Sequence, residues 1–439
     1  MKRRTLAALG FAAVLLATAT TVHAQRAKGP APAGALPKAT AEQGGMSATR
    51  LARIGTVLTK EVEERRLPGA VVMVSRRGRV VYEGAWGFQD PAAGTPMQVD
   101  AIFRIYSMTK PLVSVAAMML VEDGAIQLAD PVAKYLPAFK DIKVYRGGGQ
   151  IAADKPMTVQ DLLRHTAGLA YGEITKVAFV KDAMTEAGLV RPGSREFDVR
   201  DMSADEQVQR LAKIPLIHQP GTIWEYSLAS DVLGRVVESA SGKRLGEFLT
   251  ERLFDPLKMV DTGFHVPEDR IARLAQTFQV DPASGNRYPL IDVSAPPGND
   301  SGGAGAVSTA ADYMRFGLMM LGGGTYDVTR VLARPSVALM VSDHLGPAIM
   351  ALTSTMPGEL LLETHGYTFG LGFAVRASDG IAAVPGSAGE FMWAGYAGTY
   401  FWVDPREQIV AVLMSQAPGP AGASYRRLIK QLVYQAIVN

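Results

Sequence analysis

The sequence predicts an α+β fold in which one β-sheet is assembled from both ends of the chain and a mostly helical segment is inserted between them. Strand patterns lie near the two ends, and amphipathic helical patterns joined by long loops fill the middle. The length of 439 residues suits one large domain with an insertion, or two closely associated domains. The composition, 48% hydrophobic and 20% charged, is that of a globular protein with a substantial core. We expect a cleft between the sheet and the insertion, where functional sites commonly form.

The first 24 residues have the pattern of a secretory signal peptide. Three basic residues are followed by an apolar stretch over residues 6–17 and by Val-His-Ala, with cleavage expected after Ala24. The apolar stretch is short for a membrane span, so an uncleaved anchor is the weaker alternative. The sequence therefore predicts an exported protein, periplasmic or secreted, without a stable membrane span after cleavage.

The rest of the chain is expected to form one domain behind a linker. Residues 25–46 are rich in Ala, Pro and Gly, and they predict a flexible lead-in. The folded domain is expected over 47–437. Its sheet subdomain would comprise about 47–105 and 331–437, and its helical subdomain about 106–330.

The elements follow from caps, periodicity and turn residues. A helix is expected from the N-cap Ser47 to about Arg66, and two strands are expected on either side of Arg77-Gly78. The further elements are, in order, a helix from near Ser107 to Gly124, a helix capped by Thr158, helices over 226–242 and 307–324, strand patterns over 368–375, 390–405 and 408–416, and a closing helix over about 425–437.

Composition excludes several kinds of site. The basic residues of the leader account for the net charge of +3, so the remaining chain is balanced and no nucleic-acid partner is expected. Without cysteine there is no disulfide, Cys nucleophile or iron–sulfur cluster. The histidines lack metal-ligand spacing, so we expect no metal and no cofactor, and His165 is interpreted as structural. The absence of Gly-x-Ser-x-Gly argues against an α/β-hydrolase.

Ser107 and Lys110 form a Ser-x-x-Lys pattern, which is expected about 0.7 times by chance in a chain of this composition. Its context is more informative. Pro111 is tolerated only in a first helical turn, so Ser107 should lie near a helix N-terminus, where negative charge on its oxygen is favoured. The following helix is apolar all round. Lys110 would therefore be desolvated, its pKa would fall, and it could act as a base. An N-cap serine beside a surface-reaching lysine is the alternative, and this segment leaves both interpretations open.

The phrases around this motif resemble, in the same order, those of the serine β-lactamase and penicillin-binding-protein superfamily. They are LPGAVVMVSRRGRVVYEGAWG, FRIYSMTKPLVSVAAMMLVEDG, MTVQDLLRHTAGL, WEYSLASDVLGRVVE, GGAGAVSTAADYMRFGLMML and GLGF. The resemblance covers about 47–437 and is greatest to class C β-lactamases and family VIII carboxylesterases. It implies a β-lactamase/transpeptidase-like α/β/α sandwich with an antiparallel sheet. It also implies that Ser107 and Lys110 are the family's first motif and that Tyr226 belongs to its second, Tyr-x-Asn.

The chain departs from the lactamase pattern at two places. Leu228 stands where class C enzymes carry Asn, and Trp393-Ala394-Gly395 replaces Lys-Thr-Gly in a form similar to the Trp-Gly-Gly of family VIII esterases. In lactamases the Lys and Thr hold the substrate carboxylate, which these residues cannot do. The resemblance therefore implies that all four are substrate-binding positions for uncharged esters with short or apolar acyl groups. Packing within the sheet is the alternative role for Trp393. A Ser-x-Asn at 284–286 lies in a polar turn and is taken as coincidence.

The resemblance implies two-step acyl transfer. Ser107 would attack a small-molecule ester with either Lys110 or Tyr226 as base, and both options stay open. The oxyanion would lie between the main-chain N–H groups of Ser107 and Tyr396. Water would release the acyl group, or an alcohol or amine would do so in a transacylase. A β-lactamase, a D-Ala-specific peptidase and a non-catalytic binding homologue are the competing functions.

Overall fold

The computed structural model describes residues 35–190, 200–351 and 366–439. The predicted signal peptide and the lead-in up to residue 34 lie outside the described residues. The described helices and strands all belong to one compact unit, Leu36–Asn439. Within the described ranges, no helix is long and apolar enough to cross a bilayer.

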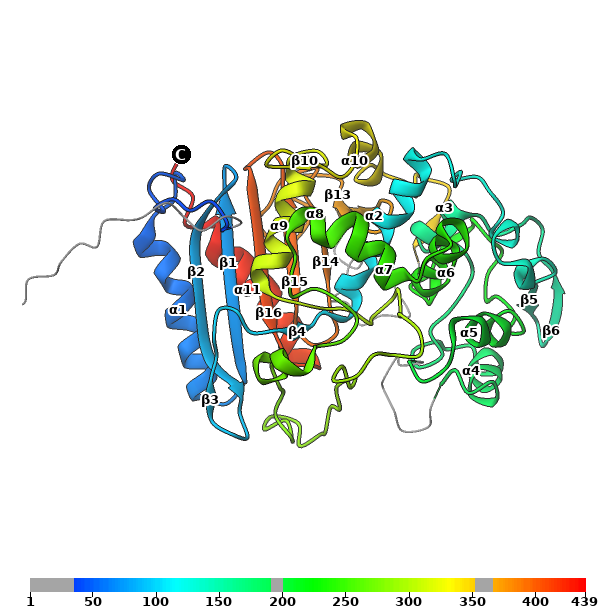
Figure 1. Ribbon diagram of the computed structural model, residues 1–439, viewed down its shortest axis with the longest axis horizontal. Helices are drawn as coiled ribbons and strands as arrows, with labels where there is room; N and C mark the ends of the chain where they lie inside the picture. Colours follow the sequence, from blue (N-terminus) through cyan, green and yellow to red (C-terminus); the bar gives the residue numbers. More distant parts are fainter. Residues whose placement is uncertain (1–34, 191–199, 352–365) are drawn as a thin grey trace, which may run out of the picture. The chain divides into compact units, whose positions relative to one another are not determined.

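An eight-stranded antiparallel sheet lies at the centre of the described residues, and both chain ends supply its strands, as predicted (Figure 1). In spatial order the strands are β12 (Tyr367–Phe369), β13 (Ala374–Arg376), β14 (Phe391–Ala394), β15 (Tyr400–Asp404), β16 (Ile409–Ser415), β1 (Gly69–Arg76), β2 (Arg79–Asp90) and β3 (Thr95–Pro96). The chain ends meet where β1 pairs with β16, from Ala70 opposite Ser415 to Arg76 opposite Ile409. Every residue of these two strands is buried, which explains their largely apolar runs.

Helices cover both faces of this sheet, which confirms the predicted three-layered α+β fold. On one face lie α1 (Ala48–Glu63) and α11 (Pro420–Tyr434), whose apolar side chains share a buried cluster with Trp402. On the other face lie α9 (Ala310–Leu321) and α2 (Thr109–Glu122), within a larger cluster. The predicted helical range thus contains α9, a helix that packs on the sheet.

The remaining described elements are mostly short, and all except β4 and η1 lie between α2 and the C-terminal strands. The helices are α3 (Val159–Leu163), α4 (Ala178–Glu186), α5 (Ala204–Leu211), α6 (Ala229–Ser241), α7 (Leu245–Leu249), α8 (Asp255–Leu257) and α10 (Arg334–Met340). Short 3₁₀ helices are η1 (Tyr106–Met108), η2 (Val132–Lys134), η3 (Pro137–Phe139) and η5 (Glu268–Arg273), and η4 (Thr250–Phe254) is a short π-helix. Strand pairs are β4 (Phe103–Arg104) with β8 (Val307–Ser308), β5 (Lys143–Arg146) with β6 (Gly149–Ala152), β7 (Ile223–Trp224) with β11 (Met350–Ala351), and β9 (Thr325–Tyr326) with β10 (Thr329–Arg330).

The early element boundaries agree with the sequence-based predictions. The Ser47 hydroxyl accepts a hydrogen bond from the main-chain N–H of Arg50 at 3.3 Å, so it caps α1, which ends at Glu63, slightly earlier than predicted. The hairpin between β1 and β2 turns at Arg77 and Gly78. Both have positive φ, the conformation that matches the twist of paired antiparallel strands.

Two late elements differ from the predictions. The strand pattern over 368–375 forms two short strands, β12 and β13, because Gly370 and Gly372 close a turn between them. A side chain at Gly370 would meet the Met340 main-chain oxygen at 2.1 Å, and Gly372 has a φ of 91°. The closing helix, α11, begins at Pro420 instead of residue 425, since proline suits the first turn of a helix.

The prediction of a flexible lead-in is wrong for residues 36–46. Leu36 and Met46 are buried, and the main-chain N–H of Ala39 donates to the Val80 oxygen at 3.0 Å. This stretch therefore packs beside β2. Its composition is typical of a linker, but the apolar side chains within it bury against the folded domain.

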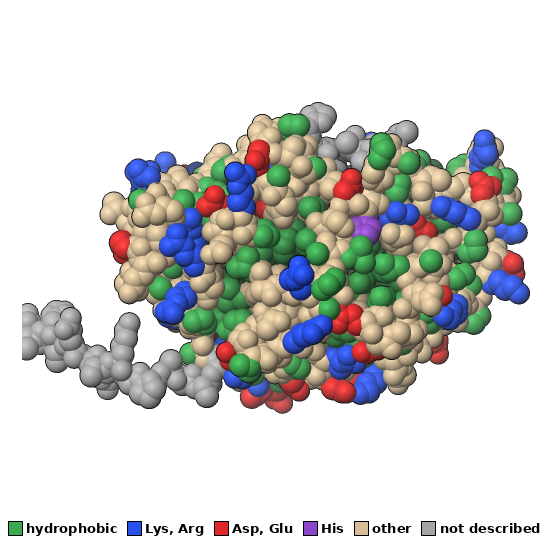
Figure 2. Space-filling view, turned by 90° about the horizontal axis from the view of Figure 1, so that it is seen from above, with side chains coloured by type: hydrophobic (Ala, Val, Ile, Leu, Met, Phe, Trp, Pro, Cys, Tyr) green, Lys and Arg blue, Asp and Glu red, His purple; other side chains and the backbone are tan. Residues whose placement is uncertain are grey.

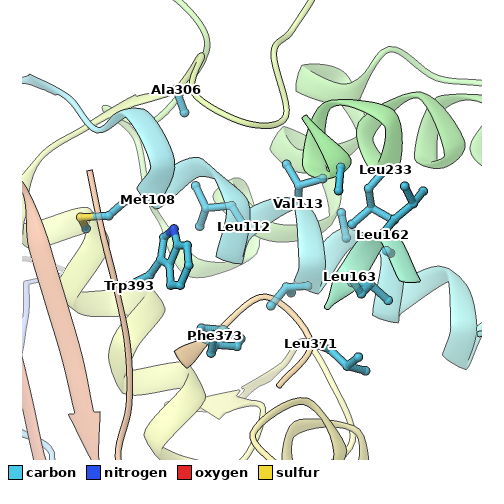
Figure 3. Packing of buried hydrophobic residues seen from close by; sticks show 14 of the residues in the cluster. Met108, Leu112, Val113, Leu162, Leu163, Leu233, Ala306, Leu371, Phe373 and Trp393 are labelled. Carbon is cyan, nitrogen blue, oxygen red and sulfur yellow. The ribbon is translucent and has the colours of Figure 1, made fainter. Parts of the chain in front are cut away.

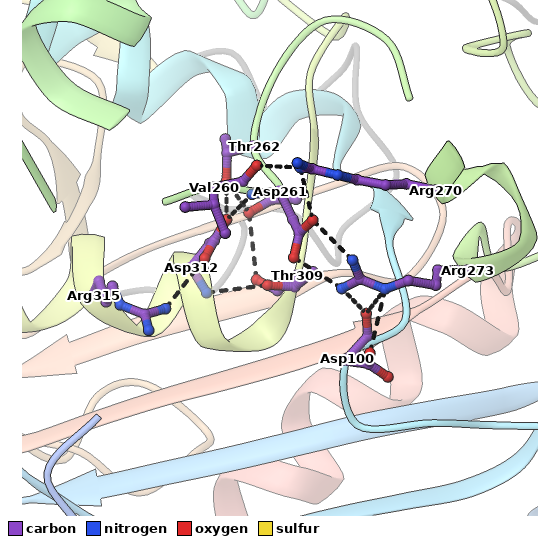
Figure 4. A network of polar contacts seen from close by, with 10 residues as sticks. Asp100, Val260, Asp261, Thr262, Arg270, Arg273, Thr309, Asp312 and Arg315 are labelled. Atoms are coloured by element: carbon purple, nitrogen blue, oxygen red, sulfur yellow. Dashed lines mark hydrogen bonds and ion pairs between the residues drawn. The ribbon is translucent and has the colours of Figure 1, made fainter. Parts of the chain in front are cut away.

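A polar network ties the segment after α8 to α9 (Figure 4). Asp261 accepts from Arg270 at 3.1 Å and from Arg273 at 2.8 Å. Asp312, in the first turn of α9, accepts from the main-chain N–H of Asp261 at 2.7 Å, and burial raises the pKa of Asp312 to about 6. Arg273 also donates to the Asp100 oxygen at 2.6 Å, so the network reaches the chain that leads into β4.

The surface carries mixed charge. On the face shown in Figure 2, basic and acidic side chains are interspersed, with hydrophobic side chains between them. Large hydrophobic side chains with high exposure, such as Val328 and Val260, lie far apart in the sequence. Single exposed hydrophobic residues are normal on folded proteins, so they need no special explanation.

Candidate active site

Ser107 lies in η1, a single 3₁₀ turn that leads directly into α2, which confirms the predicted helix start. The preceding residue, Tyr106, has a φ of 44°, a left-handed conformation that is strained in any residue but glycine. Packing holds it there. The main-chain N–H of Ile291 donates to the Tyr106 hydroxyl at 3.1 Å, and the Tyr106 ring meets that of Tyr396 edge-on. Contacts with residues outside its own helix therefore stabilise the backbone conformation next to the predicted nucleophile.

The structure brings the predicted nucleophile together with both predicted bases. Lys110 Nζ lies 3.2 Å from Ser107 Oγ, and the Tyr226 hydroxyl donates to the same oxygen at 2.6 Å. Lys110 arrives there on the first turn of α2, whereas Tyr226 comes from the chain between β7 and α6. Ser107 remains partly exposed, while Lys110 and Tyr226 are buried. Of these three residues, Ser107 is therefore the most accessible to solvent.

Lys110 is enclosed by oxygen acceptors and aromatic rings. Besides Ser107, its Nζ contacts the Gly303 main-chain oxygen at 2.7 Å and the Tyr171 hydroxyl at 3.0 Å. Burial lowers the pKa of Lys110 to about 7, and the charge of Asp231 acts in the opposite direction. The lysine can therefore gain and lose a proton near neutral pH, as a general base must.

Tyr226 is surrounded by aromatic neighbours. Its ring packs against those of His165, Tyr171 and Trp393, with centroids 5.0, 5.3 and 5.7 Å away. Burial raises the pKa of Tyr226 above its usual value, and the hydrogen bond with Ser107 offsets this only in part. The phenol is therefore protonated in the resting site, and the lysine is the better proton acceptor of the two candidates.

Asp231 organises the loop that faces the lysine, and the sequence analysis does not identify it. From the first turn of α6, its Oδ1 accepts from the Ser301 hydroxyl at 2.6 Å and from the main-chain N–H of Gly303 at 3.1 Å. A buried carboxylate thus binds the main-chain N–H of Gly303, the residue whose carbonyl contacts Lys110. A negative first helical turn is common in any helix, so the sequence offers no specific signal for this role.

Tyr171 is a second site residue that the sequence analysis does not identify. It is 3% exposed and lies 61 residues beyond Lys110, which it contacts. Burial raises the pKa of its hydroxyl well above the usual value, so it is a neutral phenol. The available signal is weak: a tyrosine in the small-residue phrase Gly-Leu-Ala-Tyr-Gly needs a polar partner if it is buried.

His165 has the environment of a structural residue, which agrees with its interpretation from the sequence. It is 1% exposed, and its ring packs against Trp224, Tyr226 and Phe369. Burial holds the pKa of His165 well below its usual range, with the nearby Lys110 acting in the same direction. A neutral imidazole in this position supports the Tyr226 ring.

The predicted substrate-binding positions have different environments. Trp393 is 1% exposed and packs against Tyr226 and Phe369. It belongs to the larger core cluster, where it lies beside Met108 and Leu112 (Figure 3). Ala394 belongs to the other cluster, on the α11 face of the sheet, because successive strand residues point to opposite faces. Its side chain is therefore turned away from Ser107. Leu228 is 8% exposed in the larger cluster, at the N-cap of α6.

Gly395 brings the end of β14 against the backbone that precedes Ser107. A side chain here would meet the Ile105 main-chain oxygen at 2.3 Å and Thr399 Oγ1 at 2.2 Å. The next residue, Tyr396, packs on Tyr106. The two chain segments predicted to supply the oxyanion N–H groups are therefore adjacent. Ser284 and Asn286 lie in an exposed turn, in agreement with the interpretation of that Ser-x-Asn as coincidence.

Known proteins are similar to this chain in sequence and in fold. A sequence profile of the family described as beta-lactamase matches residues 54–435. Protein Rv1367c of Mycobacterium tuberculosis is 35% identical over 363 residues, covering 80% of this chain and 86% of that protein. Esterase EstB of Burkholderia gladioli is 33% identical over 367 residues, covering 82% of this chain and 88% of the esterase. The solved structure of EstCE1, described as a hydrolase with promiscuous acyltransferase activity, has a TM-score of 0.73 and 27% identity, covering 88% of this chain and 99% of that one.

Proposed function

Because the chain belongs to the beta-lactamase family and is a serine hydrolase with esterase relatives, we propose that it is a carboxylesterase for uncharged short-chain esters. The observation that carries this proposal is the contact of one serine oxygen with two buried polar groups. Ser107 Oγ lies within hydrogen-bond reach of both Lys110 Nζ and the Tyr226 hydroxyl.

The first step of the proposed reaction acylates Ser107. Neutral Lys110 takes the serine proton as Oγ bonds to the ester carbonyl carbon, and the developing oxyanion is stabilised by the N–H groups of Ser107 and Tyr396. The tetrahedral species then collapses. Its bond to the alcohol oxygen breaks, and the alcohol leaves with the proton that Lys110 returns, either directly or through the Tyr226 hydroxyl.

The second step hydrolyses the acyl-enzyme. A water molecule gives a proton to the lysine and bonds to the acyl carbon through its oxygen. The bond to Ser107 Oγ then breaks, and the serine recovers the proton as the carboxylic acid leaves. The same groups serve both steps, so loss of either Lys110 or Tyr226 should slow both.

The substrate class follows from the residues that surround the site. Trp393 stands where lactamases place the lysine of Lys-Thr-Gly, and Leu228 stands where class C enzymes place an amide. Both are buried among hydrophobic side chains. Moving a substrate carboxylate into such surroundings without a cationic partner is unfavourable, so neutral acyl groups are preferred.

The test compares two esters that differ in charge. The substrates are p-nitrophenyl butyrate and the mono-p-nitrophenyl ester of glutaric acid, whose acyl chain ends in a carboxylate. We expect kcat/KM to be about tenfold or more higher for the butyrate ester than for the glutarate ester. Ser107→Ala should abolish turnover. Intact mass spectrometry should detect the butyryl group on Ser107. Fast nitrocefin turnover with negligible ester cleavage would instead make the protein a β-lactamase.

Acyl transfer to an alcohol is the second candidate function, and it is favoured by the likeness to EstCE1. In this reaction an alcohol takes the place of water in the second step. Adding increasing concentrations of a primary alcohol to p-nitrophenyl butyrate would yield a butyrate ester of that alcohol. Formation of butyric acid alone at every alcohol concentration would leave hydrolysis as the only activity.

A further inference from the structure

Helix α11 lies on the opposite face of the sheet from α2. One of its buried cationic side chains, Arg426, contacts the end of β14, next to the predicted oxyanion-hole residue Tyr396. Arg426 Nη2 donates to the Gly395 main-chain oxygen at 2.6 Å, and Arg426 is 5% exposed. Gly395 directly follows β14 and directly precedes Tyr396. The arginine thus contacts the carbonyl of the peptide whose N–H belongs to Tyr396.

Two donors hold this carbonyl and so fix the direction of the N–H: Arg426, and the main-chain N–H of Gly398 at 3.1 Å. No peptide among the described residues is cis, so the carbonyl of Gly395 and the N–H of Tyr396 point in opposite directions from one rigid plane. A donor that holds the carbonyl on the α11 side therefore aims the N–H away from α11. On the preceding side, the N–H of Gly395 donates to the Thr399 oxygen at 2.9 Å. The two peptides that flank the Gly395 Cα are therefore both restrained.

We propose that Arg426 is a positioning residue for the oxyanion hole: it holds the Gly395–Tyr396 peptide so that its N–H faces the carbonyl oxygen of an ester bound at Ser107. This inference rests on the proposed function, in which Tyr396 supplies that N–H. Arg426 touches no reacting atom and acts through the peptide.

The charge of Arg426 also strengthens the donor. A hydrogen bond to the carbonyl end of a peptide polarises the whole group and makes its N–H a better donor. The guanidinium acts on the site as well. Burial raises the pKa of Tyr226, and the charge of Arg426 is among the smaller causes that lower it. A fixed positive group on the far side of the sheet therefore favours negative charge at the reaction centre.

A second cation on the same helix shows that α11 is firmly attached to β14. Lys430, one helical turn after Arg426, forms a buried ion pair with Glu390, the residue before β14. The hydroxyl of Tyr434 also donates to Glu390, at 3.2 Å. α11 therefore holds β14 at both ends, so the direction of the Gly395 carbonyl is set by a helix that is itself anchored.

The test uses Arg426→Met, which removes the donor and the charge, and Arg426→Lys, which keeps a cationic donor. Arg427→Met is the matched control, because Arg427 is the next residue of α11 and is exposed. Each protein is assayed with p-nitrophenyl butyrate and with its thionoester, in which sulfur replaces the carbonyl oxygen. Sulfur is a poor acceptor, so the preference for the oxygen ester reports the oxyanion hole itself.

For Arg426→Met we expect kcat to fall about tenfold with KM within about twofold, and the preference for the oxygen ester to fall about three- to tenfold. Arg426→Lys should recover part of both, and Arg427→Met should match the wild type. If Arg426→Met keeps the wild-type preference for the oxygen ester over the thionoester, the proposal is overturned even if kcat falls. The fall in kcat would then come from a general structural change. Melting temperatures of all variants identify such a change.

A second measurement separates this inference from the choice of substrate. A fluorophosphonate probe labels the serine through a phosphoryl oxyanion and needs no ester. We expect Arg426→Met to be labelled about tenfold more slowly than the wild type. An unchanged labelling rate would overturn the role of Arg426 whether or not the protein is an esterase. If the wild type cleaves no ester but Arg426→Met is still labelled more slowly than the wild type, the esterase proposal is refuted and the role of Arg426 stands.

Discussion

Lys110 Nζ lies closer to the main-chain oxygen of Gly303, at 2.7 Å, than to Ser107 Oγ, at 3.2 Å. The carbonyl favours the ammonium form because it accepts a hydrogen bond, whereas burial favours the neutral amine. Burial is the larger effect, and it brings the pKa of the lysine to about 7. The charge of Asp231, which accepts a hydrogen bond from the main-chain N–H of Gly303, opposes the effect of burial.

The first prediction concerns the pH dependence of ester cleavage. Only neutral Lys110 can take the proton of Ser107, so kcat/KM for p-nitrophenyl butyrate should rise with pH through a midpoint near 7. The assay is a pH series from 5 to 9.5, corrected for spontaneous hydrolysis. An ascending limb centred near the ordinary lysine value of 10.5 would contradict the assignment of the base.

The second prediction concerns stability. Between pH 7 and about 10.5 the unfolded chain carries a proton on Lys110 that the folded protein does not, so the free energy of unfolding rises with pH there. At neutral pH the buried lysine is therefore destabilising, and Lys110→Met should raise the melting temperature at pH 7 while it abolishes activity. The gain should shrink as the pH approaches 10.5, because removing the proton from the lysine then costs progressively less. Lys134→Met, at an exposed position, is the control, and an equal rise there would refute the argument.

The third prediction concerns Tyr171. Its hydroxyl accepts a hydrogen bond from Lys110, so Tyr171→Phe removes one partner of the ammonium. The lysine pKa should fall further, and the ascending limb of kcat/KM should move to lower pH, with a loss of rate of about tenfold. Tyr400→Phe is a matched control, since its hydroxyl contacts Met392 and its side chain lies in the α11-side cluster. The same displacement in both variants would exclude a specific role for Tyr171.

The fourth prediction concerns the glycine that ends β14. Gly395→Ala would place a methyl group 2.3 Å from the Ile105 main-chain oxygen, which belongs to rigid backbone, so the strand end must shift. A displacement on the order of 1 Å at a catalytic group can lower the rate about 100-fold. We expect that loss in kcat for p-nitrophenyl butyrate. Gly149→Ala, where the nearest atom is 3.9 Å away, should leave kcat unchanged, and normal activity in Gly395→Ala would show that the strand end adapts.

Contacts between residues that are close in the sequence could be predicted, whereas contacts between distant residues could not. Ser107 and Lys110 are three residues apart, so helix geometry alone places them together, and Pro111 marks the first turn. The Ser47 cap and the Arg77-Gly78 turn are equally local. Tyr226 required the resemblance to a family, because nothing in its own neighbourhood points to Ser107.

The residues that the sequence analysis missed are connected by long-range packing. Tyr171 and Gly303 meet at Lys110, which lies on a different segment from each of them. Trp393 and Ala394 show a second limit. Strand alternation puts them on opposite faces, but only the packing of α2 and α11 decides which face belongs to the site.

By itself, the sequence determined the α+β class, the helix that begins just after Ser107 and the nucleophile–lysine spacing, since these depend on neighbours within a helical turn or strand. The tertiary structure decided the rest. Tertiary packing buries Lys110 and so lowers its pKa. It also brings Asp231 to the main-chain N–H of Gly303 and Arg426 to the main-chain oxygen of Gly395. Desolvation and hydrogen bonding depend on which distant segments come together, and that is known only once the layers have packed.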